Sequence, residues 1–300
     1  MLTSQQLRQT AAQSGVRDIT FVEIDVILTH LLQLFHEQGL TDHLAFKGGT
    51  FLRKMIFGPK GRLSTDLDFT CHSEIDSDDA MIRILDALEH PYHGISFRFD
   101  RDKDWYLTDE GFAANPLCFH DENPKGVKIK IQVSTRAKPI MPVHVIPQME
   151  QGYFKLLRFQ PAAIASLATE EVIAEKIRAA SQRSKIRDLY DLAEISRGVL
   201  NKDVIRPLAV LKLWESGKAG LDFAHLCQRI ESRDDYDVQD LHNLLRKDQK
   251  PELDKMIDEV CSGFRFLKNL TEMESKLVAD TSRRLKKEAE TLRNQLRDPS

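Results

Sequence analysis

The stretch FKGGTFLRKMIFGPKGRLSTDLDF, residues 46–69, joins two features that guide the interpretation of the whole chain. It begins with a glycine pair and a hydroxyl residue, Gly48, Gly49 and Thr50, and ends with two aspartates one residue apart. A glycine pair lets the backbone turn tightly and direct its N–H groups at an anion, and the threonine hydroxyl adds a donor. This turn therefore predicts a phosphate-binding segment.

The two aspartates, Asp66 and Asp68, lie in a strand-like segment, TDLDF. Side chains two residues apart in a strand point to the same face, so Leu67 and Phe69 are left to pack on the other face. Two carboxylates on one face repel each other unless a cation lies between them. A hard cation such as Mg²⁺, or Mn²⁺ in its place, accepts one or two carboxylates and completes its shell with substrate phosphates.

Each feature taken alone is most often structural, because glycine pairs are common in turns and aspartates are common at solvated edges. The two features together, in this order, are more specific. A turn that binds phosphates next to carboxylates that bind their metal is the arrangement of a nucleotidyl-transfer site.

Composition limits the other classes of function. The chain has 300 residues, of which 41% are hydrophobic and 30% charged, and a formal net charge of −3. This balance excludes a broad basic surface, so contact with nucleic acid requires a local patch. The cysteines are far apart in the sequence and form no CxxC pair, which favours reduced thiols. We find no membrane span and no signal peptide, and we expect a cytoplasmic protein.

The chain divides into two predicted domains, a mixed α+β domain over residues 1–160 and a helical domain over 161–300. In the first, spacing predicts helices over 21–39 and 80–90, and strands over 43–46, 67–71, 95–99 and 127–134. The segment 100–126 is rich in turn formers and is expected to be mostly loop, with one short strand at 116–119. The last stretch, 270–300, predicts a terminal helix packing on its own domain through Leu285, Ala289, Leu292 and Leu296.

The order of motifs closely resembles the AbiEii/AbiGii family of bacterial nucleotidyltransferase-like toxins, which includes the MenT toxins. The family pattern is KGGTxL followed by RxSxDxDF, and residues 47–69 satisfy it. A second match, EEVIAEKIRAASQRSKIRDLYDL at 170–192, resembles the family's AEKxxA followed by RDxYDL. The resemblance covers roughly residues 40–195, and it implies a nucleotidyltransferase-like mixed sheet followed by a helical domain.

The resemblance also implies roles for individual residues. The triphosphate would be bound by Gly48, Gly49, Thr50, Arg62 and Ser64, and the metal by Asp66 and Asp68. Lys176 would contact the nucleotide or the transferring phosphate, with Asp188 or Asp191 completing the catalytic group. Contacts to RNA phosphates would come from Arg53, Lys54, Lys60, Arg178, Arg183, Lys185 and Arg187.

The residues of the second motif are less decisive by themselves. Thr169 is placed to cap a helix whose first turn holds Glu170 and Glu171, where negative charge suits the helix dipole. From the residues alone, the favoured interpretation is that Lys176 and Arg187 pair with nearby acids, because charge runs on helices are usually solvated faces. The resemblance reverses that preference.

One position departs from the expected chemistry. Polymerase-like transferases usually place a third carboxylate on a neighbouring strand, and the segment VKIKIQVS has Gln132 there, on the face shared with Lys130 and Ser134. An amide cannot act as a base. The departure leaves Asp188 or Asp191 as the expected activator of the attacking hydroxyl.

The resulting expectation is a toxin of a toxin–antitoxin or abortive-infection system, with a cognate antitoxin as partner. It would use Mg²⁺ to transfer a nucleoside monophosphate from an NTP to the 3′ end of tRNA, which blocks aminoacylation and growth. Two alternatives stay open: transfer to a protein hydroxyl, and a nucleotide-binding regulator without turnover. Release of pyrophosphate separates the last from both enzymes.

Overall fold

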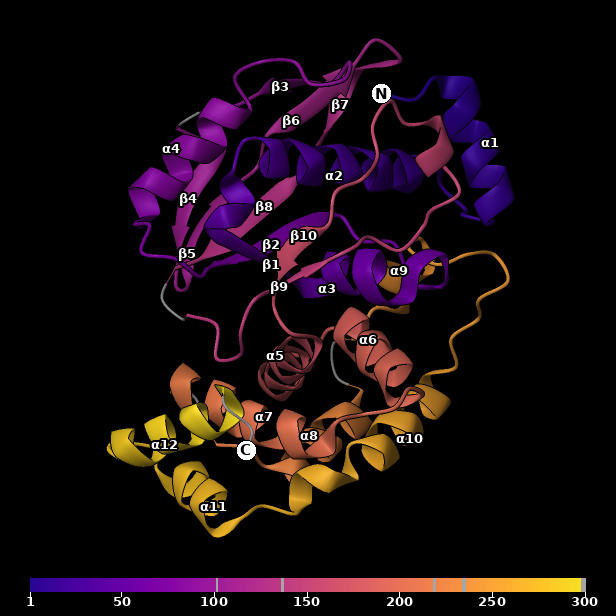
Figure 1. The fold of residues 1–300 in the computed structure, drawn as a ribbon. Coiled ribbons are helices and arrows are strands. Elements are labelled where there is room, and N and C mark those ends of the chain that lie inside the picture. The colour runs from indigo at the N-terminus through magenta and orange to yellow at the C-terminus, as the bar shows by residue number, and fades with distance from the viewer. Residues whose placement is uncertain (101, 136–137, 218–219, 234–235, 298–300) are drawn as a thin grey trace. The chain divides into compact units, whose positions relative to one another are not determined.

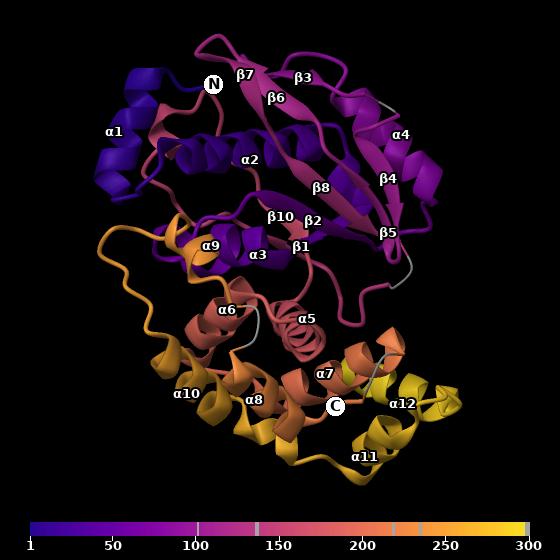
Figure 2. The same cartoon turned by 180° about the vertical axis from the view of Figure 1, so that it is seen from behind.

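The computed structural model describes residues 1–100, 102–135, 138–217, 220–233 and 236–297 of the chain. It separates into two compact units. The first, which we call the sheet unit, contains Met1–Pro139, Val143–Leu167 and His242–Gln249. The second, the helical unit, contains Ile140–Pro142, Ala168–Leu241 and Lys250–Ser300. Figures 1 and 2 show the ribbon from opposite sides, and each unit is described by itself below.

The sheet unit contains a mixed sheet of seven strands and a second sheet of three. The order of the large sheet is β4 (Trp105–Thr108), β5 (Gly111–Ala114), β8 (Lys130–Ser134), β2 (Asp66–Cys71), β1 (Leu44–Lys47), β10 (Ile164–Ser166) and β9 (His144–Ile146). The small sheet runs β3 (Ser96–Arg98), β6 (Leu117–His120) and β7 (Asn123–Lys128). The predicted α+β class is therefore confirmed.

The central strand β2 pairs antiparallel with β1 and parallel with β8. Its side chains alternate as the sequence predicts. Leu67 and Phe69 are at most 1% exposed, whereas Asp66 and Asp68 are partly exposed on the other face. The two carboxylates therefore project from one face of the middle of the sheet.

The longest helix of the sheet unit, α2 (Ile19–Glu37), lies between the two sheets in both views of the ribbon (Figures 1 and 2). Its Phe35 ring packs 5.8 Å from the Phe69 ring of β2, and its Glu23 carboxylate accepts a hydrogen bond from Asn123 of β7. The helix is long and apolar enough to cross a membrane by composition, a property that the sequence analysis missed. However, 78% of the 18-residue stretch that meets this criterion is buried inside the protein, as expected for a core helix.

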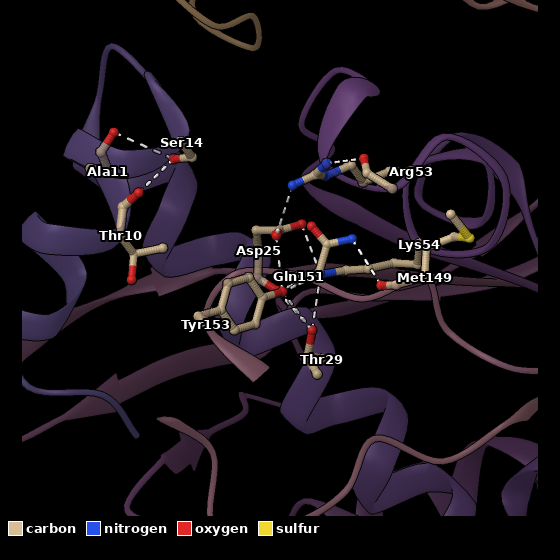
Figure 3. A network of polar contacts seen from close by, with 11 residues as sticks. Thr10, Ala11, Ser14, Asp25, Thr29, Arg53, Lys54, Met149, Gln151 and Tyr153 are labelled. Carbon is tan, nitrogen blue, oxygen red and sulfur yellow. Dashed lines mark hydrogen bonds and ion pairs between the residues drawn. The ribbon is translucent and has the colours of Figure 1, made fainter. Parts of the chain in front are cut away.

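An ion pair inside the sheet unit joins α2 to the segment that begins at the glycine pair. That segment is α3 (Gly48–Phe51), which contains both glycines and is continued by the π-helical η2 (Leu52–Phe57). The Nζ of Lys54, which is fully buried, lies 2.8 Å from Oδ1 of Asp25 and also donates to Thr29 and Tyr153 (Figure 3). Burial raises the pKa of Asp25, but the charges of Lys54 and Arg53 outweigh it and lower that pKa to about 2.

Remaining elements of the sheet unit are α1 (Ser4–Ser14), α4 (Ser77–Ala87) and three short 3₁₀ turns, η1 (Leu40–Asp42), η3 (Gly58–Lys60) and η4 (Phe154–Leu156). The segment 242–249 returns to this unit from late in the chain. The N–H of Leu63 donates to the carbonyl of Leu244 at 2.8 Å, and Leu244 is buried in a cluster with Leu7, Val22 and other apolar side chains.

Two sequence-based predictions for this unit are wrong. The segment 100–126, expected to be mostly loop, contributes β4, β5, β6 and the start of β7. The single strand expected over 127–134 is two strands in different sheets, because the chain leaves the small sheet at Lys128 and enters the large one at Lys130. Between them the N–H of Ile129 donates to the carbonyl of Pro116 at 3.1 Å, and its side chain is fully buried. Alternation persists across the switch, so the sequence gives no sign of it.

The described part of the helical unit contains helices α5 (Thr169–Gln182), α6 (Ile186–Ser196), α7 (Lys202–Ser216), α8 (Phe223–Ser232), α10 (Leu253–Gly263), α11 (Glu272–Ala279) and α12 (Lys286–Arg297), with the 3₁₀ turn η5 (Arg265–Lys268). Helix α9 (Val238–His242) reaches the boundary with the sheet unit. The boundary expected at residue 160 differs from that of the structure, since β10 still belongs to the sheet unit.

The terminal stretch forms two helices rather than one. The Oδ2 of Asp280 accepts from the N–H of Leu285 at 2.8 Å and from the indole of Trp214 at 3.1 Å, so this carboxylate fixes the bend between α11 and α12. Of the four side chains predicted to pack, Ala289, Leu292 and Leu296 are buried and Leu285 is partly exposed. Helix α12 contacts α7 and α11 of its own unit. Packing within the domain is confirmed. The expected cap at Thr169 is wrong, because Ala168 is the N-cap of α5 and makes no side-chain bond.

The buried ion pair gives a first prediction. Asp25→Asn should lower the free energy of unfolding by on the order of 3 to 5 kcal/mol, because Lys54 is left buried without its carboxylate. Adding Lys54→Met should recover part of that loss, since the buried ammonium is then removed. Urea unfolding of the wild type, both single variants and the double variant measures the coupling. Strictly additive losses would contradict an energetically coupled pair.

Candidate active site

The glycine turn directly follows β1 and lies against the side chains that the sequence motif joins to it. Gly48 has φ +83°, in the left-handed region, and a Cβ added there would lie 2.2 Å from Oδ2 of Asp68. A Cβ added at Gly49 would lie 2.7 Å from a terminal nitrogen of Arg62 and 3.4 Å from Oγ of Ser64. The two glycines are therefore required for the backbone to approach both the carboxylate and the guanidinium.

Thr50 has a different role from the one expected. Its side chain is fully buried, and its hydroxyl donates to the backbone carbonyl of Asp66. Because a hydroxyl has one proton to donate, this bond occupies the donor that the sequence analysis assigned to the triphosphate. Thr50 instead links the turn to the start of β2 by this hydrogen bond.

Asp66 and Asp68 fit the donor set of a hard cation. Both are partly exposed on one face of β2, and the hydroxyl of Thr65 donates to Oδ1 of Asp66 at 3.2 Å. Among the described residues, no group of three or more His, Cys, Asp or Glu side chains is arranged to bind a metal. Two carboxylates suffice for Mg²⁺ when substrate phosphates and water supply the other oxygens.

The strands on either side of β2 bring three further polar side chains to the carboxylates. In the register, Lys47 of β1 and Gln132 of β8 are the partners of Asp68 on its two sides. Lys130 of β8 is the partner of Asp66. The amide of Gln132 thus occupies the neighbouring-strand position where the sequence analysis noted the missing carboxylate. Lys47, which is 8% exposed, was not predicted as a site residue, although its place directly before the glycine pair is a signal.

The basic residues of this segment divide by burial. Arg62 and Ser64 are each 6% exposed beside Gly49, and Arg62 also donates to the carbonyl of Leu63. Lys60 is exposed. Arg53 and Lys54 are 6% and 0% exposed, so the expectation that they contact RNA is wrong: their charges are used inside the protein, against Asp25.

A second cluster lies in the helical unit, around Lys176 of α5. Its Nζ is 3.0 Å from Oδ1 of Asp188 and 2.7 Å from Oδ2 of Asp191, both on α6. Arg183 donates to the other oxygen of Asp188 at 2.8 Å. Lys176 is 8% exposed and each aspartate 2%. The pairing of Lys176 with acids, favoured from the residues alone, is therefore present, although in a buried setting and not on a solvated face.

Both aspartates contact the ammonium of Lys176, and Asp188 also accepts from Arg183. Burial raises the pKa of Asp188, but the charges of Lys176 and Arg183 outweigh it, so that pKa lies well below its usual range. A carboxylate of this kind is a weak base. That Asp188 or Asp191 activates the attacking hydroxyl stays a prediction. Both carboxylates lie where they orient Lys176.

The other basic residues of this motif lie on two helices and the break between them, because α5 ends at Gln182 and α6 begins at Ile186. Arg183 and Lys185 are exposed, and Arg178 and Arg187 are partly exposed. The Nε of Arg187 lies 3.1 Å from Asp240, a pairing that the residue-based interpretation anticipated. Contact with RNA at these four side chains stays a prediction.

The two glycines give contrasting predictions. Gly48→Ala should cost about 1 to 2 kcal/mol through its left-handed backbone alone, and more by displacing Asp68. Gly49→Ala should cost less, because only the end of the Arg62 side chain has to move. Thermal unfolding of both variants measures the difference, with Gly152→Ala as control because its Cβ would meet nothing within 4 Å. Equal melting temperatures for the two variants would disprove the close approach to Asp68.

The structure is similar to MenT4, a nucleotidyltransferase toxin from Mycobacterium tuberculosis, with a TM-score of 0.83 and 23% identity over 99% of this chain and 100% of that one. A Helicobacter pylori protein described as a nucleotidyltransferase matches with a TM-score of 0.50 and 19% identity, over 85% of this chain and 97% of that one. At these identities the likeness shows a shared fold. Among curated proteins, no sequence matches.

A family profile matches residues 30–298 of the chain. It describes the nucleotidyl transferase AbiEii toxins of type IV toxin–antitoxin systems. The match includes the glycine turn, both aspartates of β2 and the Lys176 cluster. It also extends past the region in which the motifs were recognised, through the helical unit. The chain belongs to the AbiEii family of nucleotidyltransferase toxins.

Proposed function

We propose that this protein transfers a nucleoside monophosphate from an NTP to the 3′ end of tRNA, releasing pyrophosphate and blocking aminoacylation. The observation that carries the proposal is the pair Asp66 and Asp68 on one face of β2, against the turn at Gly48 and Gly49. A cognate antitoxin, implied by the toxin family, would restrain the activity.

The chain's own residues would act on the triphosphate in the sheet unit. The backbone N–H groups of Gly48 and Gly49 and the guanidinium of Arg62 are donors for phosphate oxygens. Asp66 and Asp68 would bind Mg²⁺, which supplies positive charge to the phosphates when bound. An acceptor hydroxyl then forms a bond to the α-phosphorus as the bond to the pyrophosphate oxygen breaks, and the hydroxyl proton is released.

Lys176 is proposed as a catalytic residue of the helical unit. Asp188 and Asp191 fix its ammonium at 3.0 and 2.7 Å, and Arg183 balances the second negative charge. An ammonium held charged and oriented by two carboxylates is suited to contact a phosphate. Asp188 and Asp191 both position Lys176 in this proposal.

The choice of tRNA rests on the family and on exposed basic side chains. Lys60 of the sheet unit, and Arg183 and Lys185 of the helical unit, are exposed and can meet RNA phosphates. A chain with a net charge of −3 needs such local sites. Neutralising Lys185 should therefore weaken RNA binding and its salt dependence without changing the transfer step at saturating RNA.

The experiment incubates the purified protein with total tRNA, Mg²⁺ and each labelled NTP in turn, and follows label on RNA and on protein. We expect label on tRNA from one or more NTPs. Asp66→Asn and Asp68→Asn should reduce transfer at least a hundredfold and leave folding intact, because they remove charge that stabilises the transferring phosphates. Lys176→Gln should reduce transfer as well, but it also leaves two buried carboxylates without their ammonium and should lower stability, so its rate is compared at equal folded fraction.

Asp121→Asn is the matched control, since Asp121 is exposed at the turn between β6 and β7. Label on a protein instead of tRNA would identify a protein hydroxyl as acceptor. Nucleotide binding without pyrophosphate release would identify a regulator. Full transfer by Asp66→Asn at equal folding would disprove the site.

Gln132 allows an independent test of metal binding. Gln132→Glu places a third carboxylate beside Asp68 and should lower stability without metal, by about 1 kcal/mol for like charges near ~4 Å in a solvated setting. Mg²⁺ should reverse the loss, because a cation that binds the native state stabilises it. Thermal unfolding with and without Mg²⁺ compares this variant with wild type and with Gln38→Glu, a change at the exposed end of α2. Equal metal-induced shifts in all three would place Gln132 outside the site.

A further inference from the structure

The sheet unit contains a cavity of about 260 Å³ that none of the proposed nucleotide-binding residues lines. Helix α1 contributes one wall through Thr10 and Ser14, and the loop at Gln151 and Gly152 contributes another. Figure 3 shows Thr10 and Ser14 to one side of the group formed by Asp25, Arg53, Gln151 and Tyr153. The cavity therefore opens onto the buried ion pair between α2 and η2.

The charges at the base of this cavity do not balance. Asp25, which also lines the cavity, is in contact with two cations, Lys54 at 2.8 Å and Arg53 at 3.4 Å. All three side chains are at least nine-tenths buried. Burial lowers the pKa of Lys54 to about 8, which leaves it mostly charged at neutral pH. The cluster thus carries one excess positive charge away from water, and a buried charge without a counter-ion is costly.

Arg53 is the cation of the cluster that faces the cavity, because Arg53 lines it and Lys54 does not. Its terminal nitrogens donate to the carbonyl of Gly58 and to Asp25. Its Nε is buried and has no hydrogen-bond partner among the described residues. Arg246, also on the wall, is already paired with Asp248 at 2.7 Å, so it does not add to the excess charge.

The rest of the wall is largely apolar. Val16, Val22 and Leu63 line the cavity and are 7%, 3% and 3% exposed. A simple inorganic anion would leave this surface in contact with water. An anion with an apolar body would satisfy the unbalanced charge and cover the apolar wall at once.

We propose that this cavity binds a small organic anion, with its charged group at Arg53 and its apolar body against Val16, Val22 and Leu63. The site is separate from nucleotidyl transfer, since neither the glycine turn nor Asp66 and Asp68 line it. Binding therefore needs no NTP, metal or RNA. A ligand in this cavity would contact α1, α2 and the segment that begins at the glycine turn.

The experiment uses the full chain without NTP or metal, and titrates it with benzoate in a calorimeter. Benzoate has a single carboxylate on an apolar ring, and benzamide has the same shape without the charge. We expect benzoate to bind at millimolar concentrations, as fits a ligand of few atoms, and benzamide at least tenfold more weakly. Absence of benzoate binding, or equal binding of benzamide, would overturn the proposal.

Two variants locate the site. Gly152→Phe adds a ring at an exposed residue that lines the cavity and whose Cβ would meet nothing within 4 Å, so it should obstruct benzoate binding and leave stability unchanged. Arg53→Met should weaken binding at least tenfold, because Lys54 then neutralises Asp25 and no excess charge remains. Asp66→Asn should bind benzoate as the wild type does. Wild-type affinity in Gly152→Phe would overturn the assignment even if Arg53→Met failed to fold.

Discussion

The pairing of β2 with β1 on one side and β8 on the other is the constraint on which the candidate site depends. Because Lys47 and Asp68 are partners in this register, the chain that leaves β1 turns directly beside the carboxylate, and only glycine fits there. The same register sets Gln132 on the other side of Asp68. A shift by one residue would turn both carboxylates into the apolar layer beneath α2 and bring Leu67 and Phe69 to the polar face.

Much of this arrangement could be predicted from sequence, because it is local. The alternation around Asp66 and Asp68, the apolar helix α2 and the glycine turn each depend on neighbours within a few residues. The predictions that were wrong concern residues whose partners lie far away in the sequence. Lys54 was taken for an RNA contact, since its carboxylate partner lies on another helix, at Asp25. The change of sheet near Ile129 leaves alternation intact, and β4 and β5 are short strands among turn-forming residues.

Two of the buried lysines, Lys176 and Lys54, differ in the charge of their surroundings. Lys176 and Arg183 face two aspartates, so that group is balanced and its ammonium remains charged and oriented. Lys54 and Arg53 share one aspartate, and the excess charge lies beside a cavity. A balanced buried group is suited to hold one geometry during a reaction. A buried group with excess positive charge favours binding of a further anion. The two lysines are therefore suited to different roles, Lys176 to a fixed geometry and Lys54, with Arg53, to anion binding.

The return of residues 242–249 to the sheet unit has a consequence for biosynthesis. Leu244 is part of the apolar cluster beneath α1 and bonds to the backbone just before the Ser64–Asp68 motif, yet the whole of α5, α6, α7 and α8 is translated before it. Emergence of its own strands from the ribosome is therefore not enough for the sheet unit to complete its core. The core is completed only after most of the helical unit has been synthesised. A chain truncated within α8 would retain every motif residue of the toxin and still lack Leu244, which bonds to the backbone of Leu63 and completes the apolar cluster around it.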